Sequence, residues 1–194
     1  KDMEGISSAL TNLDFPLMVK AQTTVGGRGK AGGIRTALYK QEALEAAERI
    51  LSMRIGGMKV HGVLLEEMVE ASREIYLAIT IDQRTRCPLL LAGSAGGMDV
   101  ENMPAHTIRR WSLDPLEALP PEVLEQASRF LLRGETGTQE VRSTIQAMWR
   151  LFRGMDCELV EINPLAETPK GLLALDAKVV LDDKARWRRS ELFE

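Results

Sequence analysis

The stretch Gly26-Gly27-Arg28-Gly29-Lys30-Ala31-Gly32-Gly33 decides how this sequence is interpreted. Five glycines within eight residues allow the backbone to approach a ligand closely and to turn its N–H groups inward. Arg28 and Lys30 place two cations beside those amides. The composition therefore suits a phosphate group. A surface turn without a ligand could have the same composition, so the loop alone leaves both interpretations open.

The flanking residues predict that the loop joins two strands, at residues 15–24 and 34–39. Although the G-x-G-x-x-G spacing is present, a dinucleotide-binding loop must open a helix, and this loop does not. A Walker A loop is excluded because Ala31 stands where a Ser or Thr must meet Mg²⁺. Lys20, near the end of the first strand, could reach the same phosphates. A solvated lysine at a strand end is the alternative.

Apolar periodicity predicts the remaining elements. Helical spacing gives three buried faces: Leu44, Ala47 and Leu51 within residues 41–53; Leu124, Ala127 and Leu131 after Pro120 and Pro121; and Val141, Ile145, Met148, Leu151, Phe152 and Met155. Further strands are predicted at residues 62–67, 74–82, 88–93, 157–163 and 172–181, with a second small glycine loop at residues 94–97. Strands and helices mixed without strict alternation predict an α+β fold.

A carboxylate and an amide lie two residues apart in the last predicted hairpin. Period-two alternation puts Glu161 and Asn163 on one face of their strand. If the turn is centred on residues 169–170, Asn163 lies opposite Asp176, and Glu161 lies opposite Lys178. One carboxylate and one amide oxygen, with phosphates and water completing the shell, suit a nucleotide-bound Mg²⁺. A plain cross-strand ion pair between Glu161 and Lys178 is the alternative.

The composition limits the classes of partner. Lys and Arg total 25 against 28 Asp and Glu, and a net charge of -3 argues against nucleic acid or an anionic membrane as a partner. Cys87 and Cys157 are expected to be free thiols of a reducing, cytosolic-type compartment. His61 and His106 have no obvious catalytic partner and are expected to be structural. No apolar run approaches the roughly 20 residues of a membrane span. Because the chain opens with Lys1 rather than Met, we expect residues to be missing upstream.

Several motifs taken together resemble the β subunit of succinyl-CoA synthetase (ADP-forming succinate–CoA ligase) and its relative malate–CoA ligase. They are Val19-Lys20-Ala21-Gln22, the glycine loop at residues 26–33, Glu161-Ile162-Asn163-Pro164-Leu165 and Ala174-Leu175-Asp176-Ala177-Lys178. The matches occur in order and run through nearly the whole chain, which makes them far more specific than any single glycine loop.

The resemblance implies an ATP-grasp fold, in which two α+β lobes clasp a nucleotide. Residues 1–67 would form the smaller lobe with the glycine-rich loop, and residues 68–194 the larger lobe with the metal-binding hairpin. The C-terminal CoA-ligase domain of such subunits would be absent from this chain. By the same resemblance the protein is expected in the cytoplasm, or in the mitochondrial matrix of a eukaryote.

The resemblance also assigns roles to individual residues. The implied nucleotide-binding residues are Lys20, Gly27, Arg28, Gly29, Glu66, Val69 and Glu74, of which Lys20 and the loop contact phosphates; the implied Mg²⁺ ligands are Asn163 and Asp176; and the implied catalytic residues are Lys20 and Glu161. Glu161 matches a carboxylate that faces a phosphohistidine of the partner α subunit. In the family's reaction an acid, CoA and ATP or GTP give acyl-CoA, ADP or GDP, and phosphate. The dicarboxylic acid and CoA would be bound by the complete complex.

Two other functions remain open: malate–CoA ligation, and a nucleotide-binding or assembly module of the same fold without catalysis. The sequence also departs from the family. Residues 93–97 read Gly-Ser-Ala-Gly-Gly where Ser-Thr-Glu-Gly-Gly is usual, residues 54–61 are short, and Lys184 stands where Asn is usual. Because the C-terminal domain would be absent, nucleotide binding, of either ATP or GTP, is expected of this chain by itself rather than turnover.

Overall fold

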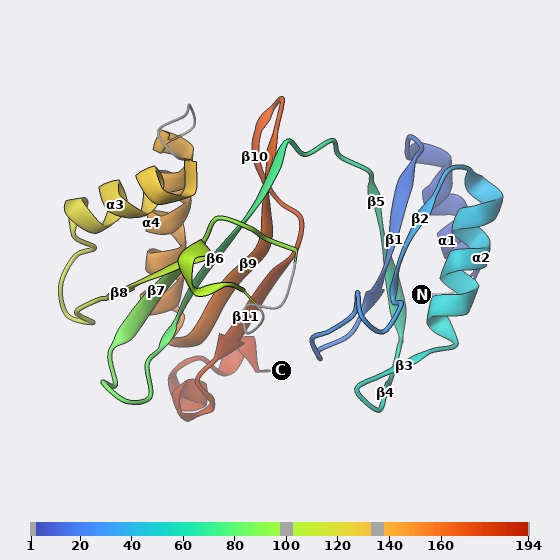
Figure 1. Ribbon diagram of the computed structural model, residues 1–194. Helices are drawn as coiled ribbons and strands as arrows, with labels where there is room; N and C mark the ends of the chain where they lie inside the picture. The colour runs from blue at the N-terminus through green and yellow to red at the C-terminus, as the bar shows by residue number, and fades with distance from the viewer. Residues whose placement is uncertain (1–2, 98–102, 133–137, 194) are drawn as a thin grey trace. The chain divides into compact units, whose positions relative to one another are not determined.

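The computed structural model describes residues 3–97, 103–132 and 138–193, and the chain divides into two compact units, Lys1–Val69 and Glu70–Glu194 (Figure 1). Each unit combines a sheet with helices that pack on it. The predicted α+β class is confirmed.

The first unit contains a three-stranded antiparallel sheet in the order β2-β1-β5, with α1 and α2 on one side of it (Figure 1). Its strands are β1 (Leu17–Gln22), β2 (Ile34–Ala37) and β5 (Gly62–Glu67). Its helices are α1 (Met3–Ala9), the short 3-10 helix η1 (Leu10–Asn12) and α2 (Lys40–Leu51). A small hairpin, β3 (Arg54–Ile55) and β4 (Met58–Lys59), follows α2.

The core of this unit lies between β1 and α2. Side chains alternate along β1, so that Leu17, Val19 and Ala21 are fully buried on one face. The buried face of α2 consists of Ala43, Ala46, Ala47 and Ile50. Of the residues predicted for the apolar face of this helix, Ala47 is fully buried, whereas Leu44 and Leu51 are partly buried at the margin of the cluster because small alanines face the sheet.

The second unit contains six antiparallel strands in the order β10-β9-β6-β7-β8, with β11 also paired to β9. The strands are β6 (Arg73–Ile81), β7 (Pro88–Gly93), β8 (Ile108–Ser112), β9 (Cys157–Thr168), β10 (Gly171–Ala174) and β11 (Ala177–Leu181). Helices α3 (Pro121–Leu132) and α4 (Thr138–Gly154) pack on one face of this sheet, and the 3-10 helix η3 (Ala105–Thr107) precedes β8 (Figure 1).

The helices of the second unit bury most of the predicted faces. Leu124, Ala127 and Leu131 of α3 are buried, as are Val141, Ile145, Met148 and Phe152 of α4. Leu151 and Met155 are 37% and 39% exposed, so their predicted burial was wrong. Leu151 falls at the edge of the helical face, and Met155 follows the end of the helix.

Several strand boundaries also differ from the prediction. The strand predicted at residues 172–181 is two strands, β10 and β11, interrupted at Leu175 and Asp176. Strand β9 continues to Thr168, five residues beyond the predicted end at Asn163. Strand β8 and helix α1 were not predicted at all.

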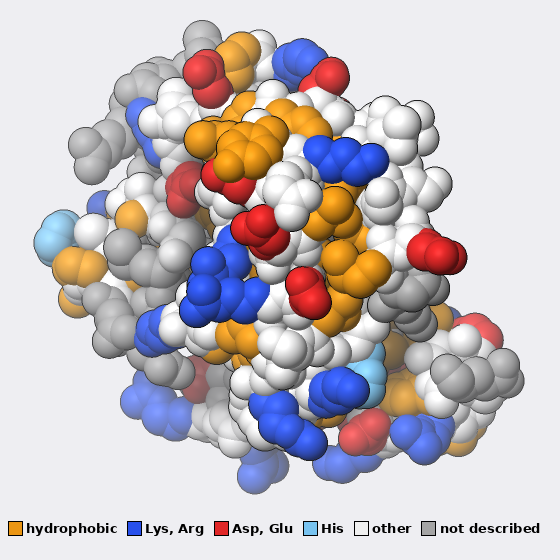
Figure 2. Space-filling view, turned by 90° about the vertical axis from the view of Figure 1, so that its right-hand side faces the viewer, with side chains coloured by type: hydrophobic (Ala, Val, Ile, Leu, Met, Phe, Trp, Pro, Cys, Tyr) orange, Lys and Arg blue, Asp and Glu red, His pale blue; other side chains and the backbone are white. Residues whose placement is uncertain are grey.

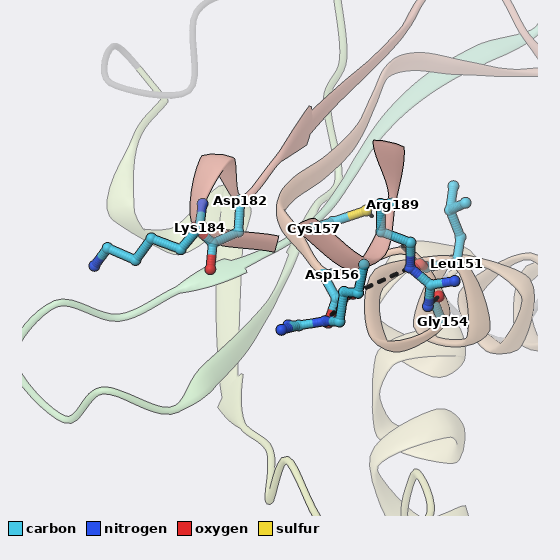
Figure 3. A network of polar contacts seen from close by, with 8 residues as sticks. Leu151, Gly154, Asp156, Cys157, Asp182, Lys184 and Arg189 are labelled. Atoms are coloured by element: carbon cyan, nitrogen blue, oxygen red, sulfur yellow. Dashed lines mark hydrogen bonds and ion pairs between the residues drawn. The ribbon is translucent and has the colours of Figure 1, made fainter. Parts of the chain in front are cut away.

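The segment after β11 is tied to the end of α4 by one carboxylate (Figure 3). The two oxygens of Asp156 accept hydrogen bonds from Nε and Nη2 of Arg188 at 3.0 and 2.9 Å, and Nε of Arg189 donates to Oδ2 at 3.2 Å. Arg189 also donates to the carbonyl of Gly154. These bonds hold the 3-10 helices η4 (Asp183–Arg188) and η5 (Ser190–Leu192) against the turn between α4 and β9.

Figure 2 shows Lys and Arg side chains interspersed with Asp and Glu side chains over one face, in keeping with the small net charge of -3. Within the described ranges, no helix combines the length and apolar character needed to cross a membrane. Cys87 and Cys157 are free thiols, as predicted.

Candidate functional site

Lys20 lies on β1, on the sheet face opposite Leu17, Val19 and Ala21. Its Nζ is 2.5 Å from Oε2 of Glu66, and the two side chains are 12% and 35% exposed. The register explains this proximity: Met18 pairs with Glu66, so Lys20 and Glu66 project from neighbouring strands on the same face. The first unit therefore brings together two residues predicted for nucleotide binding.

The predicted glycine loop joins β1 to β2 and folds back on β1. The amides of Gly33 and Ala31 donate to the carbonyls of Arg28 and Gly27 at 2.8 and 3.1 Å. A Cβ at Gly33 would lie 2.8 Å from Ile55 Cδ1, so only glycine fits there without displacing that side chain. Arg28 Nη1 donates to the carbonyl of Ala21 at 3.1 Å, which anchors the loop to the strand that carries Lys20.

Two further predicted residues lie close in sequence to the point where the chain divides into its two units. Val69 is the last residue of the first unit and is half-buried. Glu74 belongs to the second unit, near the start of β6, and is exposed. The predicted nucleotide-binding set is thus divided: Lys20, Gly27, Arg28, Gly29, Glu66 and Val69 belong to the first unit, whereas Glu74 belongs to the second.

In the second unit, Glu161 lies on β9 between β6 and β11. It pairs with Lys178 on one side, as predicted, and with Ala78 on the other. The hydroxyl of Tyr76, which is only 2% exposed, forms a hydrogen bond with the Glu161 carboxylate. Burial raises the pKa of Glu161 above its ordinary value, while Lys178 and the Tyr76 bond oppose that change. Burial and the neighbouring Glu161 charge raise the pKa of Tyr76, which keeps the phenol protonated.

The predicted register of Asn163 and Asp176 is confirmed. The amide of Asn163 donates to the carbonyl of Asp176 at 2.9 Å, and the amide of Leu175 donates to the carbonyl of Pro164 at 3.0 Å. Both residues stand where β9 meets the interruption between β10 and β11. Their side chains therefore extend from adjacent backbone segments. A carboxylate together with an amide carbonyl is a donor set that suits Mg²⁺.

The second glycine loop, at residues 94–97, contacts residues of the predicted site. The amide of Gly97 donates to Oδ1 of Asn163 at 2.8 Å, which fixes the direction of that side-chain oxygen. A Cβ at Gly96 would lie 2.6 Å from the carbonyl oxygen of Ile75, and one at Gly97 would lie 2.6 Å from Oε2 of Glu74. The loop thus packs against two predicted site residues. The only sequence signal was the Gly-Gly pair, which does not identify a contact partner 66 residues away.

In the described part of the chain, no group of three or more His, Cys, Asp and Glu side chains could hold a metal ion. A metal at Asn163 and Asp176 would accordingly draw its other ligands from phosphate oxygens and water, as nucleotide-bound Mg²⁺ does.

Comparison with known proteins identifies the family to which this architecture belongs. The ATP-grasp domain family matches residues 1–167. The chain belongs to the ATP-grasp domain family. Two of its relatives are succinate–CoA ligase [ADP-forming] subunits β. The one from Rubrobacter xylanophilus is 42% identical over 194 residues, covering 97% of this chain and 50% of the relative. The one from Ignicoccus hospitalis is 37% identical over 193 residues, covering 97% and 51%.

Solved structures agree on the ATP-grasp fold. The dinucleotide-forming acetyl-coenzyme A synthetase 1 of Ca. Korarchaeum cryptofilum, in complex with coenzyme A, Ca-AMPCP and HgCl⁺, matches with a TM-score of 0.74 at 19% identity, over 94% of this chain and 83% of that one. ATP citrate lyase from Methanothrix soehngenii, in complex with citrate and coenzyme A, matches with a TM-score of 0.72 at 25% identity, over 98% and 45%. The ATP-grasp chain spans about half the length of the curated relatives it matches.

Proposed function

We propose that this chain is the nucleotide-binding part of the β subunit of an acid–CoA ligase, with succinate as the acid. In this proposal it transfers a phosphoryl group between Mg-bound ATP or GTP and a phosphohistidine of a partner α subunit during acyl-CoA formation. The identity of 42% with a succinate–CoA ligase subunit β, over nearly the whole chain, supports an acid–CoA ligase reaction. The observation that carries the proposal is the pairing of Asn163 with Asp176. The backbone amide of Gly97 orients the side-chain oxygen of Asn163 at this position.

The residues divide the work as phosphoryl transfer requires, since that reaction depends mostly on positioning and charge neutralisation. Lys20 and the amides of the glycine loop neutralise charge on the phosphates. Asn163 and Asp176 hold Mg²⁺, which when bound shields the phosphate oxygens. Glu161 faces the histidine of the partner subunit, and Tyr76 holds its carboxylate in one position. Coenzyme A and the acid are bound by the complete complex.

Calorimetric titration with Mg-ADP and Mg-GDP tests the nucleotide site and ranks the two bases. We expect Mg²⁺-dependent micromolar binding that weakens roughly tenfold or more in Lys20→Ala and Asp176→Ala, because each variant removes a charged partner of the ligand. Lys59→Ala, which changes an exposed lysine of β4, is the matched control and should bind as the parent does. Absence of binding by the folded parent chain would contradict the assignment.

A further inference from the structure

The second unit contains a hollow of about 450 Å³. It is bordered by the residue after β7, by η3 and β8, and by one side of α3. Neither Glu74, Glu161, Asn163 nor Asp176 lines it. Its polar lining includes Ser94, His106, Arg109, Gln126 and Arg129, and none of the described residues that border it is acidic.

Two arginines from different elements supply its charge. The guanidinium of Arg109, on β8, lies over the ring of Phe130 at 4.9 Å from the ring centroid, which holds its plane in place. Arg129, on α3, is 2.7 Å from Glu125, and Glu125 also pairs with Arg142 of α4. One carboxylate therefore pairs with two arginines. Together with Arg109, this cluster has more positive than negative charges.

A neutral hydrogen-bond donor, the side-chain amide of Gln126, also borders the hollow. Oε1 of Gln126 accepts a hydrogen bond from the indole of Trp111 at 2.9 Å, which fixes the amide with its NH₂ group on the other side. The Ser94 amide donates to the Thr107 carbonyl at 2.8 Å and ties the loop after β7 to the start of β8. The hollow thus presents guanidinium and amide donors on a framework of paired strands and a helix.

We propose that this hollow binds a small phosphate monoester. Arginine forks hydrogen-bond phosphate oxygens in pairs, and two forks that approach from different elements suit a tetrahedral oxyanion better than a planar carboxylate. A hollow of about 450 Å³ also has room for the organic part of a small ligand. None of the described residues that line it belongs to the proposed nucleotide or metal set, so it would add a second anion-binding function to the chain.

Residue-resolved NMR titration of the isotope-labelled chain with inorganic phosphate and with glycerol phosphate tests the proposal. Mg-ADP is kept in excess so that phosphate binding at the glycine loop does not interfere; because the signals are assigned, the test holds even if the nucleotide does not bind. We expect shifts at the Ser94 amide, the Gln126 side-chain amide and Nε of Arg109. Acetate at the same ionic strength should not reproduce them.

The variants decide whether the two arginines are responsible. Arg109→Gln and Arg129→Gln should each weaken phosphate binding roughly tenfold, since each removes a charge-assisted hydrogen bond. Arg110→Gln is the matched control, because alternation along β8 points this exposed neighbour to the opposite face, and it should change the affinity less than about twofold. Shifts spread evenly over the surface, equal shifts with acetate, or binding unchanged in Arg109→Gln and Arg129→Gln would overturn the proposal.

Discussion

Lys20 and Glu66 form an ion pair across adjacent strands of the first unit, with 2.5 Å between Nζ and Oε2. The ammonium and the carboxylate are in direct contact at this separation, and opposite charges on partly buried side chains hold the lysine on its sheet face. A lysine proposed to meet phosphate is thus held in place before any nucleotide arrives, which reduces the side-chain freedom that binding has to remove.

A double-mutant cycle measures how much this pair stabilises the first unit. We expect Lys20→Met and Glu66→Gln to be coupled by about 1 kcal/mol in the free energy of unfolding, because the lysine is mostly buried while the carboxylate is partly exposed. Urea unfolding of both single variants and of the double variant gives this coupling. Additivity within about 0.3 kcal/mol would show that the pair contributes no stability of its own.

The Asp156 carboxylate should make the free energy of unfolding of the second unit depend on pH. Hydrogen bonds from Arg188, and then from Arg189, hold the pKa of Asp156 below its ordinary value. The stabilisation is therefore fully present above the ordinary aspartate pKa of about 3.9 and is lost as the pH falls through the lower pKa of the folded state. Thermal unfolding followed between neutral and strongly acidic pH should show this loss in the parent chain.

Asp156→Asn isolates the charge, because asparagine has the same shape and tolerates the left-handed backbone at this position, where φ is 52°. We expect it to cost about 1–2 kcal/mol at neutral pH and to reduce the acid dependence. Asp183→Asn is the control: that side chain is 89% exposed and lies 4.0 Å from Arg186, so it should change stability by less than about 0.5 kcal/mol. Equal effects of the two substitutions would contradict the role of Asp156.

The sequence predicted those parts of the fold that depend on local periodicity. Alternation and the turn at residues 169–170 were enough to place Asn163 opposite Asp176, because hairpin register follows from turn position. The apolar spacing of α4 likewise identified Val141, Ile145 and Phe152 as core residues.

Features set by distant parts of the chain could not be predicted in the same way. Strand β8 carries Arg109, Arg110 and Trp111 in succession, without the apolar alternation of a strand; it forms at the sheet edge by pairing with β7. The bond between Gly97 and Asn163 joins residues 66 positions apart. Nothing in the sequence near either residue indicates that contact.

The Gly96–Gly97 loop should tolerate no side chain. Gly96→Ala would bring Cβ within 2.6 Å of a backbone oxygen, and Gly97→Ala would combine a φ of +72° with a 2.6 Å approach to Glu74. We expect each to destabilise the chain by about 1–3 kcal/mol in urea unfolding and to weaken Mg-ADP binding, because Asn163 loses its fixed orientation.

The matched control for this loop is Gly154→Ala. Gly154 lies at the end of α4, and a Cβ there would meet no atom within 4 Å. We expect this substitution to be neutral or to stabilise the chain slightly, because alanine favours helix more than glycine does. Nucleotide binding unchanged in Gly96→Ala and Gly97→Ala would show that the loop does not orient Asn163.

Tyr76→Phe tests the hydrogen bond that positions Glu161. It removes one hydroxyl from a side chain that is 2% exposed and leaves a half-buried carboxylate without that donor, so we expect a loss of about 1.5–3 kcal/mol in the free energy of unfolding. Tyr39→Phe removes a similar bond, to Glu42, from a side chain that is 55% exposed, and it should cost far less. In the complete ligase that we propose, Tyr76→Phe should slow phosphoryl transfer while leaving the affinity for Mg-ADP unchanged, since Tyr76 is expected to act only through Glu161. An equal loss of nucleotide affinity would instead mean that Tyr76 supports the whole sheet.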